Sequence, residues 1–157
     1  MRLHLGAGDK YWPGWVNVDS YGDQDELCDC KSLPFEDETV SEIQCIHMVE
    51  HIPRMEVNGM IQDWFRVLKS GGKLVIEVPC LDKMAQMIVD GEKNIRLTLL
   101  GIFGDPRDPK PAMMHKWAYT KAELKDLLLE TGFVDVEVSE PVYHVARRDM
   151  RITAVKP

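Results

Sequence analysis

Short apolar runs alternate with longer amphipathic segments along most of this 157-residue chain. The runs at 2–5 and 15–19 are too apolar for strands that are exposed on both faces, which is typical of a buried parallel sheet. Apolar residues recur at helical spacing over 55–68, which predicts a helix. We expect strands at 2–5, 15–19, 25–30, 40–46, 74–78, 133–138 and 151–155, and helices at 55–68, 82–90, 92–103 and 120–131.

Capping and turn residues support these boundaries. Thr120 and Glu123 form a capping box at the start of the last helix, and Gly132 is a typical C-terminal stop. The segment 70–72 (SGG) separates the helix before it from the apolar strand after it. The alternation predicts one α/β domain over 1–157, with a mostly parallel twisted sheet of about seven strands. The last two strands are close enough in sequence to form a hairpin, so an antiparallel strand is expected at the end.

The first predicted strand ends in a glycine turn, and the second ends in a carboxylate. The sequence is LHLGAG over 3–8 and VNVD over 16–19, so that Gly6 and Gly8 follow one strand and Asp19 closes the next. In open α/β sheets this pairing forms a nucleotide-type pocket, because glycines allow close backbone approach and the acid accepts ribose hydroxyls. The chain therefore predicts such a pocket at the carboxyl ends of these strands.

The connection between these two strands is unusually short. A parallel crossover normally needs a dozen or more residues and a helix, whereas only 7–15 separate the strands here. Pro13 and Gly14 would also stop a helix. We therefore expect the first crossover helix to be reduced to a turn or lost, with Trp12 and Trp15 covering the sheet face that it would otherwise hide.

Composition and charge narrow the class of protein. The chain is 45% hydrophobic and 29% charged, which is ordinary for a soluble globular protein. Its net charge of −7 argues against a large phosphate-binding surface, so nucleic acid is not an expected partner. The cluster of Arg147, Arg148 and Arg151 is expected to be a solvated hairpin turn. The chain shows no signal peptide or membrane-length apolar run, so we expect a cytoplasmic location without membrane contact; its oligomeric state stays open.

The cysteines do not follow the spacing of a zinc or thioredoxin site. A single residue separates the first two, and no second close pair follows them. We expect reduced thiols on buried strands at all four positions, Cys28, Cys30, Cys45 and Cys80.

Seven short segments, taken in order, make the chain similar to the class I S-adenosylmethionine-dependent methyltransferases, and in particular to a compact group of predicted methyltransferases. No single segment decides the resemblance, but the ordered set spans nearly the whole chain. The resemblance implies a Rossmann-like methyltransferase fold, S-adenosyl-L-methionine as cofactor and methyl transfer. The negative charge favours a small-molecule or saccharide-like acceptor. The segments are 3–8 (LHLGAG), 14–19 (GWVNVD), 33–37 (LPFED), 47–51 (HMVEH), 66–74 (RVLKSGGKL), 115–117 (HKW) and 132–133 (GF).

The resemblance also implies a place along the cofactor for each of eight residues. The glycine turn would line the methionine part, and a carboxylate at the end of the second strand would accept both ribose hydroxyls. A later acid and a backbone segment would flank the adenine, and a histidine would lie near the sulfonium. In chain order these residues are Leu5, Gly6, Ala7 and Gly8 in the turn, Asp19 at the ribose, Asp29 and Cys30 at the adenine, and His47 at the sulfonium.

Three histidines are candidates for the acceptor side of the site: His47, His51 and His115. Histidine takes up a proton near neutral pH, and methyl transfer mainly requires that acceptor, methyl and sulfur be aligned. Structural roles are open alternatives: His51 could cap the turn into the next helix, and His115 could anchor its loop through hydrogen bonds. We expect His144 to lie at the surface.

Three other functional classes have some support in the sequence. The segment 47–51 matches the His-x-x-Glu-His pattern of inverted zinc proteases, but it follows a strand and Pro53 comes two residues later. The resembled methyltransferases carry the same pentapeptide without zinc, so no metal is expected. A non-catalytic module that binds S-adenosylmethionine or a nucleoside remains the alternative. A dinucleotide oxidoreductase is less favoured because the first turn lacks a third glycine.

Overall fold

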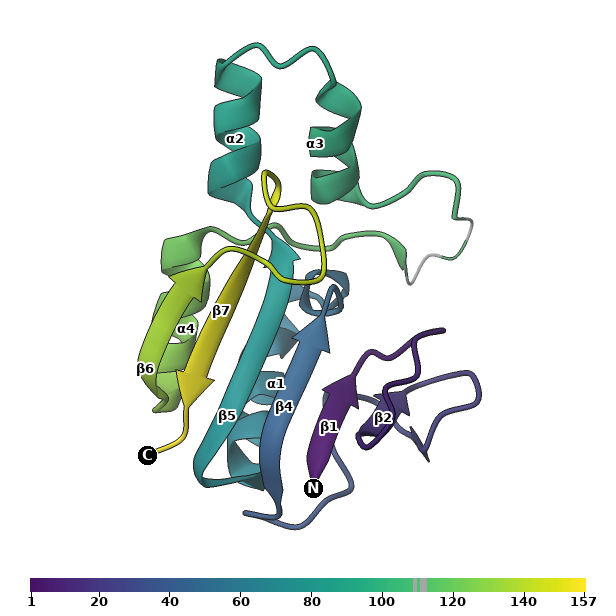
Figure 1. Ribbon diagram of the computed structural model, residues 1–157, viewed down its shortest axis with the longest axis vertical. Coiled ribbons are helices and arrows are strands. Elements are labelled where there is room, and N and C mark those ends of the chain that lie inside the picture. Colours follow the sequence, from purple (N-terminus) through teal and green to yellow (C-terminus); the bar gives the residue numbers. More distant parts are fainter. Residues whose placement is uncertain (109, 111–112) are drawn as a thin grey trace.

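Seven strands form a single sheet in the computed structural model, which describes residues 1–108, 110 and 113–157. The strand order is β3-β2-β1-β4-β5-β7-β6 (Figure 1). Neighbouring strands from β3 to β5 are parallel, whereas β7 runs antiparallel to both β5 and β6. The predicted mostly parallel sheet with an antiparallel end is confirmed. The strands are β1 (Arg2–Leu5), β2 (Val16–Asp19), β3 (Glu26–Leu27), β4 (Val40–Ile46), β5 (Leu68–Pro79), β6 (Val134–Ser139) and β7 (Asp149–Val155).

The helices also lie close to their expected positions. In α4, the Thr120 hydroxyl accepts a hydrogen bond from the Glu123 amide at 3.1 Å, and Gly132 takes the left-handed conformation of a C-cap. Both predicted caps are confirmed. None of the helices in the described part of the chain has the length and apolarity that a membrane crossing needs. The helices are the 3₁₀-helix η1 (Val49–His51), α1 (Arg54–Val67), α2 (Leu81–Val89), α3 (Ile95–Phe103) and α4 (Lys121–Thr131).

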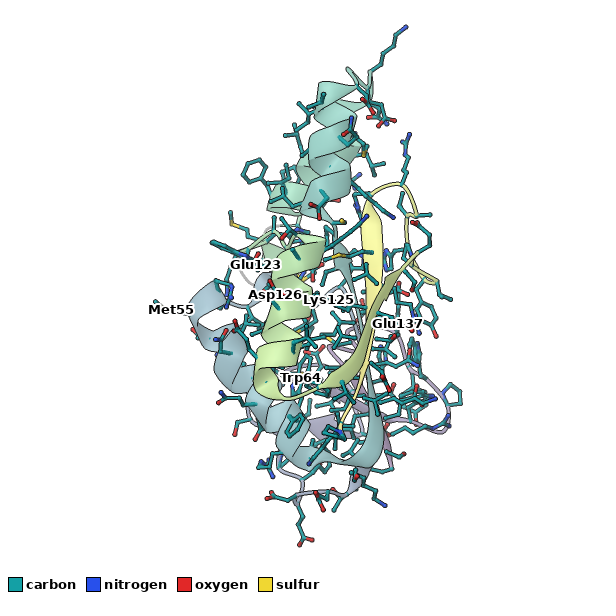
Figure 2. The ribbon with its side chains drawn as sticks, turned by 90° about the vertical axis from the view of Figure 1, so that its left-hand side faces the viewer. Met55, Trp64, Glu123, Lys125, Asp126 and Glu137 are labelled. Carbon is teal, nitrogen blue, oxygen red and sulfur yellow. The ribbon has the colours of Figure 1, made fainter. Side chains whose placement is uncertain are left out.

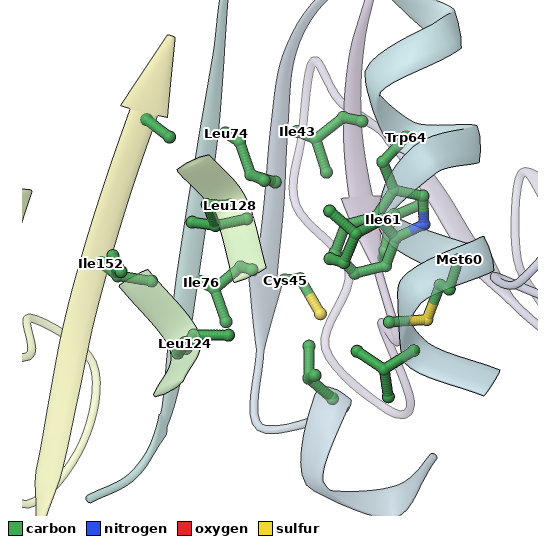
Figure 3. Close-up of a cluster of buried hydrophobic side chains, with 14 of the residues drawn as sticks. Ile43, Cys45, Met60, Ile61, Trp64, Leu74, Ile76, Leu124, Leu128 and Ile152 are labelled. Atoms are coloured by element: carbon green, nitrogen blue, oxygen red, sulfur yellow. The ribbon is translucent and has the colours of Figure 1, made fainter. Parts of the chain in front are cut away.

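The hydrophobic core lies between the sheet and the pair α1 and α4. Figure 2 shows the two helices side by side on the same face of the sheet, while α2 and α3 stand beyond the carboxyl ends of the strands (Figure 1). Every second residue of the central strands points into this layer, and each large apolar side chain buried there contributes about 1.5–3 kcal/mol. The core side chains in Figure 3 include Ile43, Cys45, Leu74, Ile76 and Ile152 from strands, Met60, Ile61 and Trp64 from α1, and Leu124 and Leu128 from α4.

The opposite face of the sheet is polar and is covered by loops. His4 and Asn17 alternate with the core residues of β1 and β2 and are both buried. No helix forms over 6–15, which confirms that the first crossover helix is lost. Trp12 instead stacks flat on His4 at 3.9 Å, and Trp15 packs edge-on against Trp12. The expected covering role of the two tryptophans is confirmed.

Several expected boundaries were wrong. β5 begins at Leu68 because that residue pairs with Val40, and Gly71 and Gly72 exchange backbone hydrogen bonds with Lys156. The segment 70–72 therefore belongs to the strand rather than separating it from α1. The predicted strand 25–30 is reduced to β3, and the predicted helix 92–103 begins three residues later, at Ile95.

The cysteine and arginine predictions also need correction. All four cysteines are free, but only Cys45 lies within a strand; the other three lie in connections next to strands. Arg148 and Arg151 are not solvated, since their side chains are only 12% and 17% exposed. They pair with Asp149 and Glu77, whose fully buried carboxylates need a charged partner.

Candidate active site

A cavity of about 280 Å³ opens at the carboxyl ends of β1, β2 and β4. The glycine turn forms one wall, and Gly6 and Gly8 both have positive φ, at 68° and 53°. A Cβ on Gly6 would lie 2.6 Å from Met48 Cβ, so only glycine fits there. The volume is near the lower end of the range for small-molecule sites. The described residues that line the cavity are Gly6, Gly8, Asp19, Ser20, Tyr21, Asp29, Cys30, His47, Met48, His51, Ile52, Met113 and Lys116.

Asp19 connects the two strands of the predicted pocket. Its Oδ2 accepts a hydrogen bond from the Gly8 amide at 2.9 Å, and its Oδ1 accepts one from the Ser20 amide at 2.7 Å. The side chain is almost fully buried, yet it forms part of the cavity wall. Oδ1 also accepts a long hydrogen bond from the Ser20 hydroxyl at 3.4 Å, whereas Oδ2 keeps a further lone pair with which the fixed group can accept a hydrogen bond from a ligand.

Asp29 and Cys30 form the wall on the side of β3. The Cys30 carbonyl accepts a hydrogen bond from Trp64 Nε1 at 2.8 Å, which fixes this segment against α1. Burial raises the pKa of the Cys30 thiol to about 12, so the sulfur stays protonated and chemically inert. Leu5 and Ala7, which we expected beside the cofactor, have buried side chains and are not among the residues lining the cavity.

His47 lies at the end of β4 in a strained backbone conformation, with a φ of 54°. Its Nδ1 is 2.9 Å from Glu50 Oε1, and its Nε2 is 3.3 Å from Asp149 Oδ2. Burial by itself would lower the pKa of His47, but the two carboxylates outweigh it and raise this pKa to about 9. His47 is therefore a cation at neutral pH and cannot act as a general base there.

A second cavity of about 290 Å³ meets the first at His47, His51 and Met113. We call it the acceptor cavity; its other lining residues among those described are Leu100, Gly104, Asp105, Asp108, His115, His144 and Arg148. The structure thus brings all three predicted catalytic histidines to one junction. A fourth histidine, His144, also lines this cavity, and its ring lies 3.9 Å from that of His47. Local sequence gave no signal for it, since the contact depends on how the β6–β7 connection crosses the sheet edge.

Backbone hydrogen bonds hold His115 and His51 in this junction. The His115 Nδ1 is 2.8 Å from the Gly101 carbonyl oxygen, and the His51 Nδ1 is 3.3 Å from that of Met114. The Glu50 carbonyl accepts the amides of residues 116 and 117, which fixes the segment after α3 on η1. His115 therefore anchors its loop through a hydrogen bond, which is the structural role that the sequence left open for it. Burial also lowers the pKa of His115, which leaves the ring neutral with Nε2 free.

The segment 47–51 does not have the geometry of a zinc-protease helix. η1 covers only Val49–His51, so His47 lies outside it and the two histidines do not share a helix face. His47 instead faces Asp149, while the rings of His51 and His115 lie 4.8 Å apart. This arrangement agrees with the expectation from sequence that the segment is not a protease site.

The chain resembles known proteins both in sequence and in fold. Residues 17–76 match a family model described as a methyltransferase domain, and this range includes Asp19, Asp29 and the histidine segment. Over these residues the chain matches a methyltransferase domain, the kind of domain that uses S-adenosylmethionine as cofactor. No curated protein sequence matches the chain significantly.

Solved structures share the fold of this methyltransferase domain over 99% of the chain. A possible exported protein from Bordetella parapertussis superposes with a TM-score of 0.69 at 18% identity, and the chain covers 61% of that protein. A methyltransferase from Thermotoga maritima, named as a possible histamine N-methyltransferase, gives 0.69 at 14% identity and 82% coverage. Phosphoethanolamine N-methyltransferase 2 from Haemonchus contortus gives 0.62 at 14% identity and 48% coverage. The chain thus spans under two thirds of the Bordetella and Haemonchus proteins.

Proposed function

We propose that this methyltransferase domain transfers the methyl group of S-adenosylmethionine to a small-molecule or saccharide-like acceptor in the acceptor cavity. The observation that carries the proposal is the junction of two cavities at His47 and His51. Methyl transfer is an in-line displacement, so two ligands must approach one another from opposite sides of a shared point. Two cavities that meet at common lining residues support such an approach of cofactor and acceptor.

The cavity at the glycine turn fits the cofactor in its chemistry. Gly6 and Gly8 keep the wall free of side chains, and the fixed Asp19 carboxylate is placed to accept ribose hydroxyls. Asp29 and the Cys30 backbone would flank the adenine. The cofactor supplies an electrophilic methyl group. The Haemonchus neighbour was solved in complex with S-adenosyl-L-methionine, which supports this use of the fold.

The acceptor cavity has the size for a small molecule, and both acidic and basic side chains line it. Asp105 and Asp108 are among its lining residues, and the hydrogen bonds from Arg107 lower the pKa of Asp105 and keep it ionised. The net charge of −7 disfavours a polyanion such as nucleic acid. Two neighbours are named after small amines, histamine and phosphoethanolamine, which supports an acceptor of this size.

The histidines have different parts in this proposal. His115 is neutral, and its Nε2 can accept a hydrogen bond or a proton from the acceptor. His51 presents a second ring at the same junction. Glu50 and Asp149 keep His47 positively charged. The ring therefore places a fixed positive charge at the junction and does not take up a proton from the acceptor.

The test is production of S-adenosylhomocysteine. The purified chain is incubated with S-adenosylmethionine and panels of small amines, alcohols and saccharides, and product is measured by mass spectrometry. The proposal expects one acceptor class to raise product formation well above the rate without acceptor. Tight cofactor binding with no turnover on any panel would instead favour the non-catalytic module.

A further inference from the structure

We propose that Glu50, His51 and His115 bind a divalent transition-metal ion at the wall of the acceptor cavity. One ligand atom from each of the three residues lies within 4.8 Å of the other two. The residues come from η1 and from the segment after α3, which are 63 or more positions apart in sequence. The inference replaces the expectation from sequence that the chain binds no metal.

Glu50 provides the first argument, because its carboxylate is buried and incompletely paired. The residue is 1% exposed, and its Oε2 accepts no hydrogen bond from the described residues. Oε1 has the charge of His47 beside it at 2.9 Å, whereas Oε2 has no charged partner in the described part of the chain. A buried carboxylate oxygen left in this state costs free energy. A cation at this oxygen would remove the cost.

The two histidines provide the second, independent argument. Each ring has Nδ1 next to a backbone carbonyl oxygen, that of Gly101 for His115 and that of Met114 for His51. A carbonyl can only accept, so both rings must carry the proton on Nδ1 and leave the lone pair of Nε2 free. In metal sites of proteins, a hydrogen bond of this kind at the other ring nitrogen orients the histidine toward the metal.

The ligand set indicates the kind of ion. Two imidazole nitrogens and one carboxylate oxygen suit Zn²⁺ and the neighbouring divalent ions, whereas Mg²⁺ and Ca²⁺ prefer oxygen alone. Each ligand atom would need to move inward by less than about 1 Å to reach a metal–ligand distance of about 2.1 Å. His51 and His115 both line the acceptor cavity, so the remaining coordination positions would be open to an acceptor heteroatom.

A neighbouring group of the same composition is a poorer candidate. His47, His144 and Asp149 also lie within 4.8 Å of one another. Asp149, however, already accepts hydrogen bonds from Arg148 and from the Val145 amide, so its oxygens are satisfied. A substitution of His144 in this second group can therefore serve as the control for a substitution of His115 in the first.

The experiment measures Zn²⁺ binding by isothermal titration calorimetry on the full chain after treatment with chelator and without S-adenosylmethionine. Wild-type protein should bind one equivalent. His115→Asn should weaken binding roughly tenfold or more, since even residues that only hydrogen-bond to a metal ligand contribute about 10- to 100-fold. Asparagine keeps a donor near the place of Nδ1, so the hydrogen bond to Gly101 and the loop are preserved. Glu50→Gln should give the same loss, with folding checked by thermal unfolding.

Two control variants make the result specific. His144→Asn removes the corresponding ring from the other group, and Cys28→Ser removes the most accessible thiol. Both should bind Zn²⁺ like wild type. The proposal is overturned if wild type shows no saturable binding, or if His144→Asn or Cys28→Ser abolishes binding while His115→Asn retains it. Because no cofactor or acceptor is present, this outcome leaves the proposed methyl transfer untouched.

Discussion

His47 Nε2 lies 3.3 Å from Asp149 Oδ2, so the end of β4 is joined to the start of β7 by a buried ion pair. The same ring has Glu50 on its other side. The imidazolium is thus held between two carboxylates that the sheet topology brings together. This arrangement raises the pKa of His47 to about 9, from an ordinary value of 6.5.

Stability should therefore depend on pH in a defined window. Because the folded-state pKa is raised, the contribution of His47 is complete below about pH 6.5 and is lost as pH rises through about 9, by up to ~3 kcal/mol. Urea unfolding between pH 6 and pH 10, with chelator present, measures it. His47→Gln should flatten the dependence; a wild-type curve as flat as that of the variant would contradict the assignment.

Asp19→Asn should weaken binding of S-adenosylhomocysteine by roughly 10- to 150-fold, since charge-assisted hydrogen bonds are worth about 1.5–3 kcal/mol. The amide keeps the size of the side chain and an acceptor for the Gly8 amide. Asp23→Asn, at an exposed residue of the following loop that does not line the cavity, is the control. Equal affinities for the two variants would remove Asp19 from the cofactor site.

The glycine turn can be tested with two matched substitutions. Gly6→Ala and Gly8→Ala both place a side chain at positive φ, which costs roughly 1–2 kcal/mol each. At Gly6 the new Cβ also meets Met48 at 2.6 Å, whereas at Gly8 it meets no atom within 4 Å. Gly6→Ala should be the more destabilising by a further ~1–3 kcal/mol in chemical denaturation. A larger loss for Gly8→Ala would mean that the turn has another shape.

His115→Asn separates an anchoring role from a chemical one. The variant keeps a donor for the Gly101 carbonyl but removes Nε2 from the acceptor cavity. Turnover should fall by about 10²-fold or more, while the affinity for S-adenosylhomocysteine stays within about twofold. This expectation holds whether Nε2 contacts the acceptor directly or through a metal ion. Wild-type turnover in the variant would show that His115 only anchors its loop.

The sequence predicted those features that depend on neighbours in the chain. The strands, the caps at Thr120 and Gly132 and the lost first helix follow from local hydrophobic pattern and turn chemistry. The pairing of Gly8 with Asp19 was also predictable, because parallel strands place their carboxyl ends at one sheet edge.

Contacts between distant segments were not predictable from these patterns. Local sequence does not show that Glu50 is buried, because the burial depends on the chain after α3, which hydrogen-bonds to the Glu50 carbonyl. Arg148 was expected in solvent, yet the β6–β7 connection turns back over Asp149 and buries it. His144 is exposed, as expected, but the same connection places its ring against that of His47. The path of a loop is set by tertiary contacts such as the buried Glu77, which accepts the amides of Val142 and Tyr143.

A crystal structure of the chain with S-adenosylhomocysteine tests the central claim most directly. The account predicts the ribose hydroxyls at the Asp19 carboxylate, the methionine part along Gly6 and Gly8, and the sulfur facing the junction at His47 and His51. The ligand bound elsewhere, or its sulfur directed away from the acceptor cavity, would contradict it.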